Sequence, residues 1–276
     1  MTLLQTTAKR TADLMGRQSW LVRHLRPAYE TLLDCLSHGR GIPYEINGVS
    51  YRVDPYQRHR LAHVYDAPVA EFLRTRVKPG AVCLNVGANV GVYVLQFSHW
   101  SSPRGRVIAF EPNPGARNVL VKHLQFNGLN NRVTLVPAAI GETAGEAILY
   151  AASADGMSRL GAPNQLIADQ VKEISVPIMT LDDYCADQKV RPDWLFMDIE
   201  GFEIAALAGG RRLIKDRGRN LGIVVEIHPE LWASANANRA RAESMLADLG
   251  RRAVPLTGQK DALAEYGLVY LEPISN

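Results

Sequence analysis

Cysteine and long apolar runs are scarce in this sequence, and both absences narrow its class. Only three cysteines, Cys35, Cys83 and Cys185, occur among 276 residues. An odd, widely spaced set excludes a disulfide framework, and without a Cys-x-x-Cys pair nothing indicates a zinc site. No stretch approaches the ~18 uninterrupted apolar residues of a transmembrane helix, and residues 1–17 lack the apolar core of a signal peptide. We therefore expect a cytoplasmic protein without a membrane span.

Concentrated positive charge is also missing. The net charge is +3 and the sequence pI is about 8.8, but Lys and Arg are spread along the chain. The densest pairs are Arg211-Arg212 and Arg251-Arg252. Nucleic-acid binders gather such residues on one face or in one run. We therefore expect no nucleic-acid partner.

The sequence does contain a regular alternation of strand and helix patterns from residue 81 onward. Strands are predicted at 81–86, 106–110, 132–136, 193–198 and 221–227, and helices at 90–99, 114–127, 203–215 and 236–249. This alternation predicts an α/β fold with a mostly parallel sheet and helices on both faces. Two further short strands, 253–256 and 267–271, fit an antiparallel pair at the edge and complete a seven-stranded sheet.

Residues 1–64 read as an extension that precedes this domain of residues 65–276. The extension is helical to about residue 40, and four leucines share one helical face: Leu21, Leu25, Leu32 and Leu36. Asn47-Gly48 between two short β-prone runs then predicts a hairpin, because both residues tolerate positive φ. We expect the helix to pack on the main domain, with an arm for homodimerisation as the alternative.

Residues 141–190 interrupt the alternation. This segment contains two strand patterns, 146–151 and 174–178, around a stretch rich in Ala, Gly and Ser. We interpret it as an insertion that carries a hairpin or lid, with Met157, Ser158 and Arg159 helping to cover a substrate.

A glycine turn follows the first strand of the alternation. Gly87-Ala88-Asn89-Val90-Gly91 leads into a helix, an arrangement that presents backbone N–H groups to a ligand. The dinucleotide pattern GxGxxG would need glycine where Asn89 and Val92 stand. Without the second glycine the backbone cannot approach a pyrophosphate closely, which counts against a nicotinamide-dependent oxidoreductase. Tight packing of the strand against the helix is the structural alternative.

An acidic residue stands at the end of the next strand. Glu111, twenty residues beyond Gly91, is placed to accept both ribose hydroxyls of an adenosine. An adenosine that lacks phosphates and carries an amino acid is S-adenosylmethionine. After the third strand, small residues including Ala139 fit the wall of an adenine slot, or equally a packed core.

Carboxylates and a histidine follow the fourth and fifth strands. Asp198 and Glu200 share a side if the chain stays extended, and Glu203 falls in the first turn of the next helix, where the helix dipole stabilises negative charge. Glu226 and His228 share one face of the fifth strand. Histidine titrates near neutrality and suits removal of a proton from a hydroxyl. The acids fit three roles: holding an amino group, orienting a hydroxyl, or binding a divalent cation.

Taken together, these segments resemble the FkbM family of S-adenosylmethionine-dependent methyltransferases over about residues 65–230. The matching motifs are Asn85-Val86-Gly87-Ala88-Asn89-Val90-Gly91, Phe110-Glu111-Pro112-Asn113, Pro137-Ala138-Ala139-Ile140-Gly141, Thr180-Leu181-Asp182-Asp183, Met197-Asp198-Ile199-Glu200-Gly201-Phe202-Glu203 and Val225-Glu226-Ile227-His228-Pro229. The resemblance implies a class I methyltransferase fold, which is Rossmann-like, and usually O-methylation of sugar or secondary-metabolite hydroxyls.

The resemblance also assigns residues to the cofactor. It implies that the pocket is lined by Asn85, Gly87, Asn89, Gly91, Glu111, Pro112, Asn113, Ala139 and Asp198. Two positions depart from the family pattern, which commonly has Asp in place of Asn85 and Lys in place of Met197. Asn85 keeps a hydrogen-bonding side chain but lacks the charge that would pair with the methionine ammonium.

We therefore expect an S-adenosylmethionine-dependent O-methyltransferase that acts on a small metabolite or glycan in sugar or natural-product biosynthesis. His228 is the preferred catalytic base, with Asp198 or Glu200 as alternatives. Mg²⁺ is a candidate second cofactor, with Asp198, Glu200 and Glu226 as candidate ligands. The alternatives are an NAD-dependent oxidoreductase and a catalytically degenerate binding scaffold.

Overall fold

The computed structural model describes residues 20–59, 61–151, 158–160 and 172–274. It divides into two compact units, one of residues 1–67 with 121–128 and one of residues 68–120 with 129–276. The division of the chain into an extension of residues 1–64 and a domain of residues 65–276 stays a prediction.

The first unit contains a helix and the predicted hairpin. Helix α2 runs over Trp20–Ser37, and strands β1 (Ile42–Ile46) and β2 (Val49–Val53) pair antiparallel. Asn47 and Gly48 at the turn have φ of 48° and 79°, which is the left-handed geometry that this turn requires. The predicted hairpin is therefore confirmed.

Three of the four leucines predicted to form the packing face of this helix are exposed. Leu25, Leu32 and Leu36 are 58%, 46% and 59% exposed, whereas Leu33 is 3% exposed. Within its own unit, α2 buries the face that carries Leu33. Packing of the leucine face on the main domain stays a prediction. The predicted helix of residues 1–19 lies outside the described residues, and dimerisation through the extension stays a prediction.

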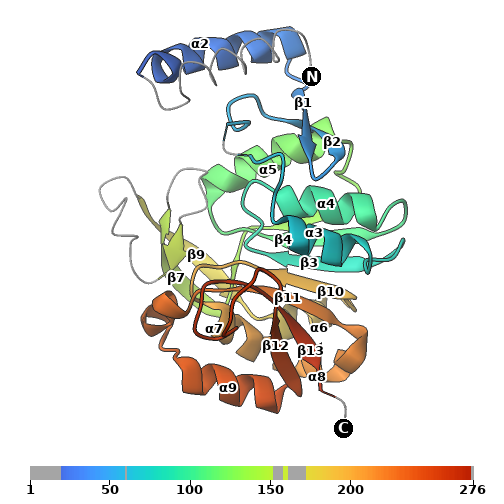
Figure 1. Cartoon of the computed structure of the whole chain (residues 1–276), viewed down its shortest axis with the longest axis vertical. Helices are drawn as coiled ribbons and strands as arrows, with labels where there is room; N and C mark the ends of the chain where they lie inside the picture. Colours follow the sequence, from blue (N-terminus) through green and yellow to red (C-terminus); the bar gives the residue numbers. More distant parts are fainter. Residues whose placement is uncertain (1–19, 60, 152–157, 161–171, 275–276) are drawn as a thin grey trace. The chain divides into compact units, whose positions relative to one another are not determined.

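The second unit is built on the predicted seven-stranded sheet (Figure 1). Its strands are β3 (Val82–Val86), β4 (Arg106–Phe110), β5 (Val133–Val136), β10 (Trp194–Met197), β11 (Gly222–Ile227), β12 (Arg251–Pro255) and β13 (Gly267–Pro273). Their order is β12-β13-β11-β10-β3-β4-β5, and β13 runs in the direction opposite to the other six strands. The order reverses at β3, which lies between β4 and β10, and ligands of such sheets bind at the carboxyl ends of the strands at this point.

Helices cover both faces of this sheet, as predicted. They are α3 (Ala67–Arg74), α4 (Val92–Trp100), α5 (Pro114–Phe126), α6 (Leu181–Asp187), α7 (Glu203–Ala208), α8 (Arg211–Arg217) and α9 (Arg239–Asp248). Side chains alternate between faces along a strand. In β10, Phe196 stacks on Tyr93 of α4, whereas Leu195 and Met197 join the buried cluster that contains residues of α6–α9.

The predicted helix of residues 203–215 is two helices, because the chain turns at Gly209 and Gly210. A Cβ at Gly209 would come 2.0 Å from the carbonyl oxygen of Gly141, so another segment passes directly against this turn. The sequence also predicted no helix at α6, whose Leu181 and Tyr184 are part of the main core.

The interrupting segment forms a second, four-stranded sheet. Its strands are β6 (Ala139–Ile140), β7 (Gly145–Ala151), β8 (Arg159–Leu160) and β9 (Lys172–Met179), in the order β6-β9-β7-β8. Strands β7 and β9 lie side by side in Figure 1 and pair antiparallel. A small apolar core contains Leu149, Leu160 and Val176. The two predicted strands of this segment are confirmed.

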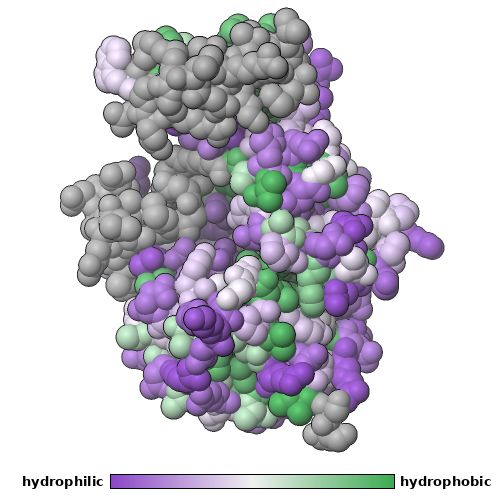
Figure 2. All heavy atoms as spheres, in the orientation of Figure 1, coloured by the Kyte–Doolittle hydropathy of each residue, from purple (hydrophilic) through white to green (hydrophobic). Residues whose placement is uncertain are grey.

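One edge of the large sheet is strand β12. On edge strand β12, Arg252 forms an ion pair with Glu272 of β13. Figure 2 shows hydrophilic and hydrophobic residues interspersed on the face in view. Charged side chains on an edge strand oppose pairing with strands of other molecules. Among the helices of the described residues, none has the length and apolarity to cross a membrane.

Candidate active site

The glycine turn after β3 passes directly against the loop after β10. Gly87 has φ of 78°, and a Cβ there would come 1.8 Å from the carbonyl oxygen of Asp198. Gly91 has φ of 95°, and its Cβ would come 2.3 Å from Leu120 Cδ1. Backbone packing thus requires glycine at Gly87, whereas at Gly91 the contact is with a side-chain end and the left-handed φ favours glycine. The close contact at Gly87 places the glycine turn beside Asp198, at the carboxyl ends of the strands.

Glu111 joins this turn to the loop after β4. Its two carboxylate oxygens accept hydrogen bonds from the backbone N–H of Asn89 at 2.7 Å and of Asn113 at 2.8 Å. Burial raises the pKa of Glu111 to about 7, although these two N–H groups and Arg117 favour the ionised form. Each carboxylate oxygen keeps a second lone pair that can accept a hydroxyl.

Two amide oxygens beside the turn are buried without a hydrogen-bond partner among the described residues. They are Oδ1 of Asn85, whose side chain is 1% exposed, and Oδ1 of Asn89. An unpaired buried acceptor costs about 1–3 kcal/mol, so such atoms are uncommon without a ligand or water. Together with Glu111, they offer a set of acceptors that fits the hydroxyl and ammonium donors of S-adenosylmethionine.

The loop after Glu111 also reaches the second sheet. Asn113 Oδ1 accepts from Gly115 N–H at 2.8 Å near the start of α5, and its Nδ2 donates to Ser158 Oγ at 2.9 Å. Pro112 lies between Glu111 and Asn113 in the chain, and its carbonyl oxygen accepts a hydrogen bond from Arg117. Ala139 belongs to the apolar core of the second sheet, so its predicted place in an adenine slot stays a prediction.

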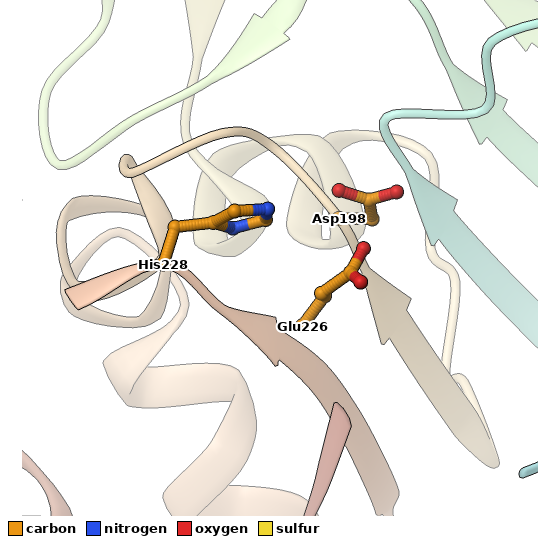
Figure 3. A group of neighbouring side chains, drawn as sticks. All are labelled: Asp198, Glu226 and His228. Carbon is orange, nitrogen blue, oxygen red and sulfur yellow. The ribbon is translucent and has the colours of Figure 1, made fainter. Parts of the chain in front are cut away.

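Asp198, Glu226 and His228 converge after strands β10 and β11 (Figure 3). One ligand atom from each lies within 4.8 Å of the others. Burial raises the pKa of Asp198 well above its usual range, and the nearby carboxylate of Glu226, to which Asp198 is hydrogen-bonded, raises it further. Tyr266 Oη donates a hydrogen bond to Glu226. The adjacent acids therefore favour a shared proton or a bound cation.

Glu200 lies outside this group. Its φ of 51° turns the chain, so the extended geometry predicted for Asp198 and Glu200 is wrong. The Glu200 carboxylate instead accepts from Nε of Arg159, on β8, at 3.3 Å. Burial raises the pKa of Glu200, and His228 and Arg159 oppose that shift.

Glu203 is the residue that sequence reasoning underestimated. Its side chain is fully buried, and it accepts hydrogen bonds from His228 Nδ1, Gly201 N–H and Trp232 Nε1 at 2.8, 2.7 and 2.9 Å. The sequence analysis assigned Glu203 only to the first turn of a helix. The one other feature that could have indicated a role in the site was its position in the same motif as Asp198.

The pKa of His228 reflects these neighbours. Burial lowers it, but the hydrogen bond and charge of Glu203, together with the charges of Glu200 and Glu226, raise it by more. The net pKa is therefore above the ordinary value of histidine, which makes His228 a stronger base once it is deprotonated.

A mostly parallel sheet with this strand order, an adenosine-compatible turn after β3 and acids after β4 and β10 define a class I methyltransferase. The model of the methyltransferase FkbM domain matches residues 85–252, and the chain belongs to this family. No curated protein sequence matches the chain.

Solved structures similar to this chain come from several organisms. The methyltransferase FkbM from Methylobacillus flagellatus KT is 17% identical with a TM-score of 0.48, over 71% of this chain and 44% of that one. Fibrillarin from Aeropyrum pernix, with natively bound S-adenosyl-L-methionine, is 13% identical with a TM-score of 0.43, over 84% and 82% of the two chains. An S-adenosylmethionine-dependent O-methyltransferase from Thermotoga maritima is 14% identical with a TM-score of 0.45, over 86% and 78%. The chain spans less than half the length of the Methylobacillus protein.

Proposed function

We propose that this protein binds S-adenosylmethionine at the turn after β3 and methylates a hydroxyl of a small metabolite or glycan. The observation that carries the proposal is the close passage of Gly87 against Asp198, which brings the turn beside the group of Asp198, Glu226 and His228. A cofactor turn and a proton-accepting group at one sheet edge are what transfer to a hydroxyl needs.

The residues present fit the cofactor. Glu111 would accept the ribose hydroxyls, and the orphan oxygens of Asn85 and Asn89 would accept donors of the ligand. The cofactor supplies an electrophilic methyl group when it is bound. The chain's contribution is to position the two reactants, which lowers the entropic part of the barrier.

The acceptor hydroxyl must also lose its proton as the oxygen is alkylated. His228 is the preferred acceptor of that proton, because its raised pKa makes it a stronger base and the carboxylates of Glu203, Glu200 and Glu226 stabilise the imidazolium. Glu200 is no longer a preferred alternative, since it is paired with Arg159. Ser158 and Arg159 of the second sheet reach Asn113 and Glu200, which supports the proposal that this sheet helps to cover the acceptor.

Ligand binding and methyl transfer test the proposal. We expect S-adenosylhomocysteine to bind in isothermal titration, and labelled methyl to pass from S-adenosylmethionine to one member of a panel of sugars and hydroxylated natural products. Absence of heat at millimolar ligand would favour the catalytically degenerate scaffold. Thermal stabilisation by NADH alone would replace the proposal with an oxidoreductase.

The role of His228 has its own test. His228→Ala should lower turnover by about 100-fold, the usual contribution of a positioned base, while S-adenosylhomocysteine affinity stays near that of the wild type. His99→Gln, at an exposed histidine of α4, is the matched control. Near-normal turnover of His228→Ala combined with an inactive Asp198→Ala would transfer the role to Asp198.

A divalent cation at Asp198, Glu226 and His228 is the second candidate, because their ligand atoms are close enough to share one ion. Of the ligands predicted from the sequence, Asp198 and Glu226 belong to this group and Glu200 does not. Activity that disappears after chelation and returns with Mg²⁺ or Mn²⁺ would establish a metal. Activity that survives chelation would leave His228 as the base.

A further inference from the structure

Glu203 occupies an unusual position for a carboxylate. It is the first residue of α7, its side chain is 0% exposed, and no Lys or Arg of the described residues forms an ion pair with it. Acids are almost never buried in this way unless their oxygens are satisfied. A residue that only complements the helix dipole needs no such burial, because exposed acids in the first turn do so equally well.

The donors around Glu203 determine which atom of His228 carries a proton. Gly201 N–H donates to Oε1 at 2.7 Å, and the indole Nε1–H of Trp232 donates to Oε2 at 2.9 Å. A backbone amide and an indole are donors only, so both oxygens act as acceptors. With Glu203 ionised, His228 Nδ1, 2.8 Å from Oε1, donates to that oxygen as well.

This arrangement has a consequence for the other ring nitrogen. A neutral imidazole carries one proton, so a proton on Nδ1 leaves the lone pair on Nε2. The ring of His228 points toward Asp198 and Glu226 in Figure 3. The three donors to Glu203 are the backbone N–H of Gly201 in the loop before α7, the ring of His228 after β11 and the indole of Trp232 in the segment 229–235. Glu203 therefore holds the ring of His228 in place from several segments of the chain.

We propose that Glu203 is a positioning residue that holds His228 as the Nδ1–H tautomer, with Nε2 free to take a proton at the site. Its effect on turnover rests on the proposed function, whereas the tautomer does not. A carboxylate or carbonyl on the second nitrogen of a working histidine orients the ring in the same way in other sites.

The tautomer is measured directly by long-range ¹⁵N–¹H spectra of protein labelled at its seven histidines. His228 is assigned by loss of its signal in His228→Gln. Above the titration of the imidazole, we expect the wild-type spectrum to show a protonated Nδ1 and an unprotonated Nε2. An Nε2–H tautomer in the wild type would overturn the proposal whether or not the protein transfers methyl groups.

Two substitutions separate positioning from structural support. Glu203→Met removes the acceptor, so the Nδ1–H signal should lose its dominance and kcat should fall by about tenfold or more, with KM for S-adenosylmethionine within about twofold. The double variant Glu203→Gln with Trp232→Phe keeps an amide oxygen for His228 and removes the indole donor that would oppose the new NH₂ group. It should restore the Nδ1–H tautomer and much of kcat.

The remaining outcomes are decisive. An unchanged tautomer in folded Glu203→Met, or an altered tautomer with unchanged kcat, would overturn the positioning role. If Glu203→Met does not fold, the double variant decides the question, because it must show the Nδ1–H tautomer. A wild-type Nδ1–H tautomer in a protein that never transfers methyl would sink the proposed function and leave this inference standing.

Discussion

At the scale of single residues, Asn85 carries an energetic cost in the free protein. Its Oδ1 is buried without a partner among the described residues, at the end of β3 next to the glycine turn. A buried acceptor of this kind destabilises the fold by about 1–3 kcal/mol. A ligand that donates a hydrogen bond to Asn85 Oδ1 would recover this cost on binding. The same side chain can therefore lower the stability of the free protein and raise its affinity for the ligand.

Substitution of Asn85 should therefore change stability and binding in opposite directions. Asn85→Leu, similar in size, should leave the free energy of unfolding unchanged or raise it by about 1 kcal/mol, because the orphan acceptor is removed. The same variant should weaken S-adenosylhomocysteine binding by about tenfold, measured by isothermal titration.

The matched variant restores the acid that the family commonly has at this position. Asn85→Asp should lower the stability of the free protein, because a buried charge has no partner, and should tighten binding of the ligand ammonium. Equal affinity of all three proteins for S-adenosylhomocysteine would remove Asn85 from the cofactor site.

At the scale of elements, the junction between β3 and β10 depends on Gly87. The turn after β3 must pass the backbone of the β10 loop with no side chain between them, since a Cβ would come 1.8 Å from the Asp198 carbonyl oxygen. This contact fixes the glycine turn after β3 and the loop after β10 in position relative to each other. The second sheet adds to it through the contacts of Ser158 and Arg159.

Two alanine variants separate backbone strain from this contact. Gly80 has φ of 87°, close to the 78° of Gly87, but no atom lies within 4 Å of a Cβ built there. Gly80→Ala should cost only the left-handed strain, about 1–2 kcal/mol, in urea unfolding. Gly87→Ala should cost about 1–3 kcal/mol more, since the Asp198 backbone must move. An equal loss of stability in the two variants would show that the loop after β10 moves away from the new side chain without a loss of stability.

At the scale of the whole molecule, four buried or partly buried titratable groups shift in one direction. The pKa of Glu111 is raised to about 7, and those of Asp198, Glu200 and His228 are raised as well. In the window from about pH 4.5 to 8, the folded state thus holds protons that the unfolded chain has released. By linkage, the free energy of unfolding must fall as pH rises through this window.

The predicted decline is measurable by urea unfolding between pH 5.5 and 8. Over this pH range Glu111 alone contributes roughly 2 kcal/mol of lost stability, an order-of-magnitude figure from the shift of its pKa to about 7. Exposed carboxylates with lowered pKa, Glu71, Asp248 and Asp261, titrate below this window and do not offset it. Saturating S-adenosylhomocysteine should flatten the decline, because hydroxyl donors favour the ionised Glu111. Stability that is flat or rises with pH in the free protein would contradict these shifts.

Local patterns in the sequence determined most of this architecture. Apolar patterns located the seven strands of the large sheet and strands β7 and β9 of the second sheet, Asn47-Gly48 located the hairpin, and the order of motifs identified the family. Asp198, Glu226 and His228 were also predictable as neighbours, because they follow adjacent strands whose carboxyl ends meet at one edge. The strands and the hairpin depend on residues a few positions apart, where backbone geometry alone constrains the outcome.

Only the tertiary structure decided the roles of Glu200, Glu203 and the leucines of α2. A left-handed backbone at Glu200 turned it toward Arg159, and burial placed Glu203 between His228 and Trp232, 25 and 29 residues further along the chain. The amphipathic pattern of α2 indicated an apolar face but not what covers it, and that face is exposed. Hydrogen bonds and burial between distant segments depend on how the elements pack, and no local pattern encodes that.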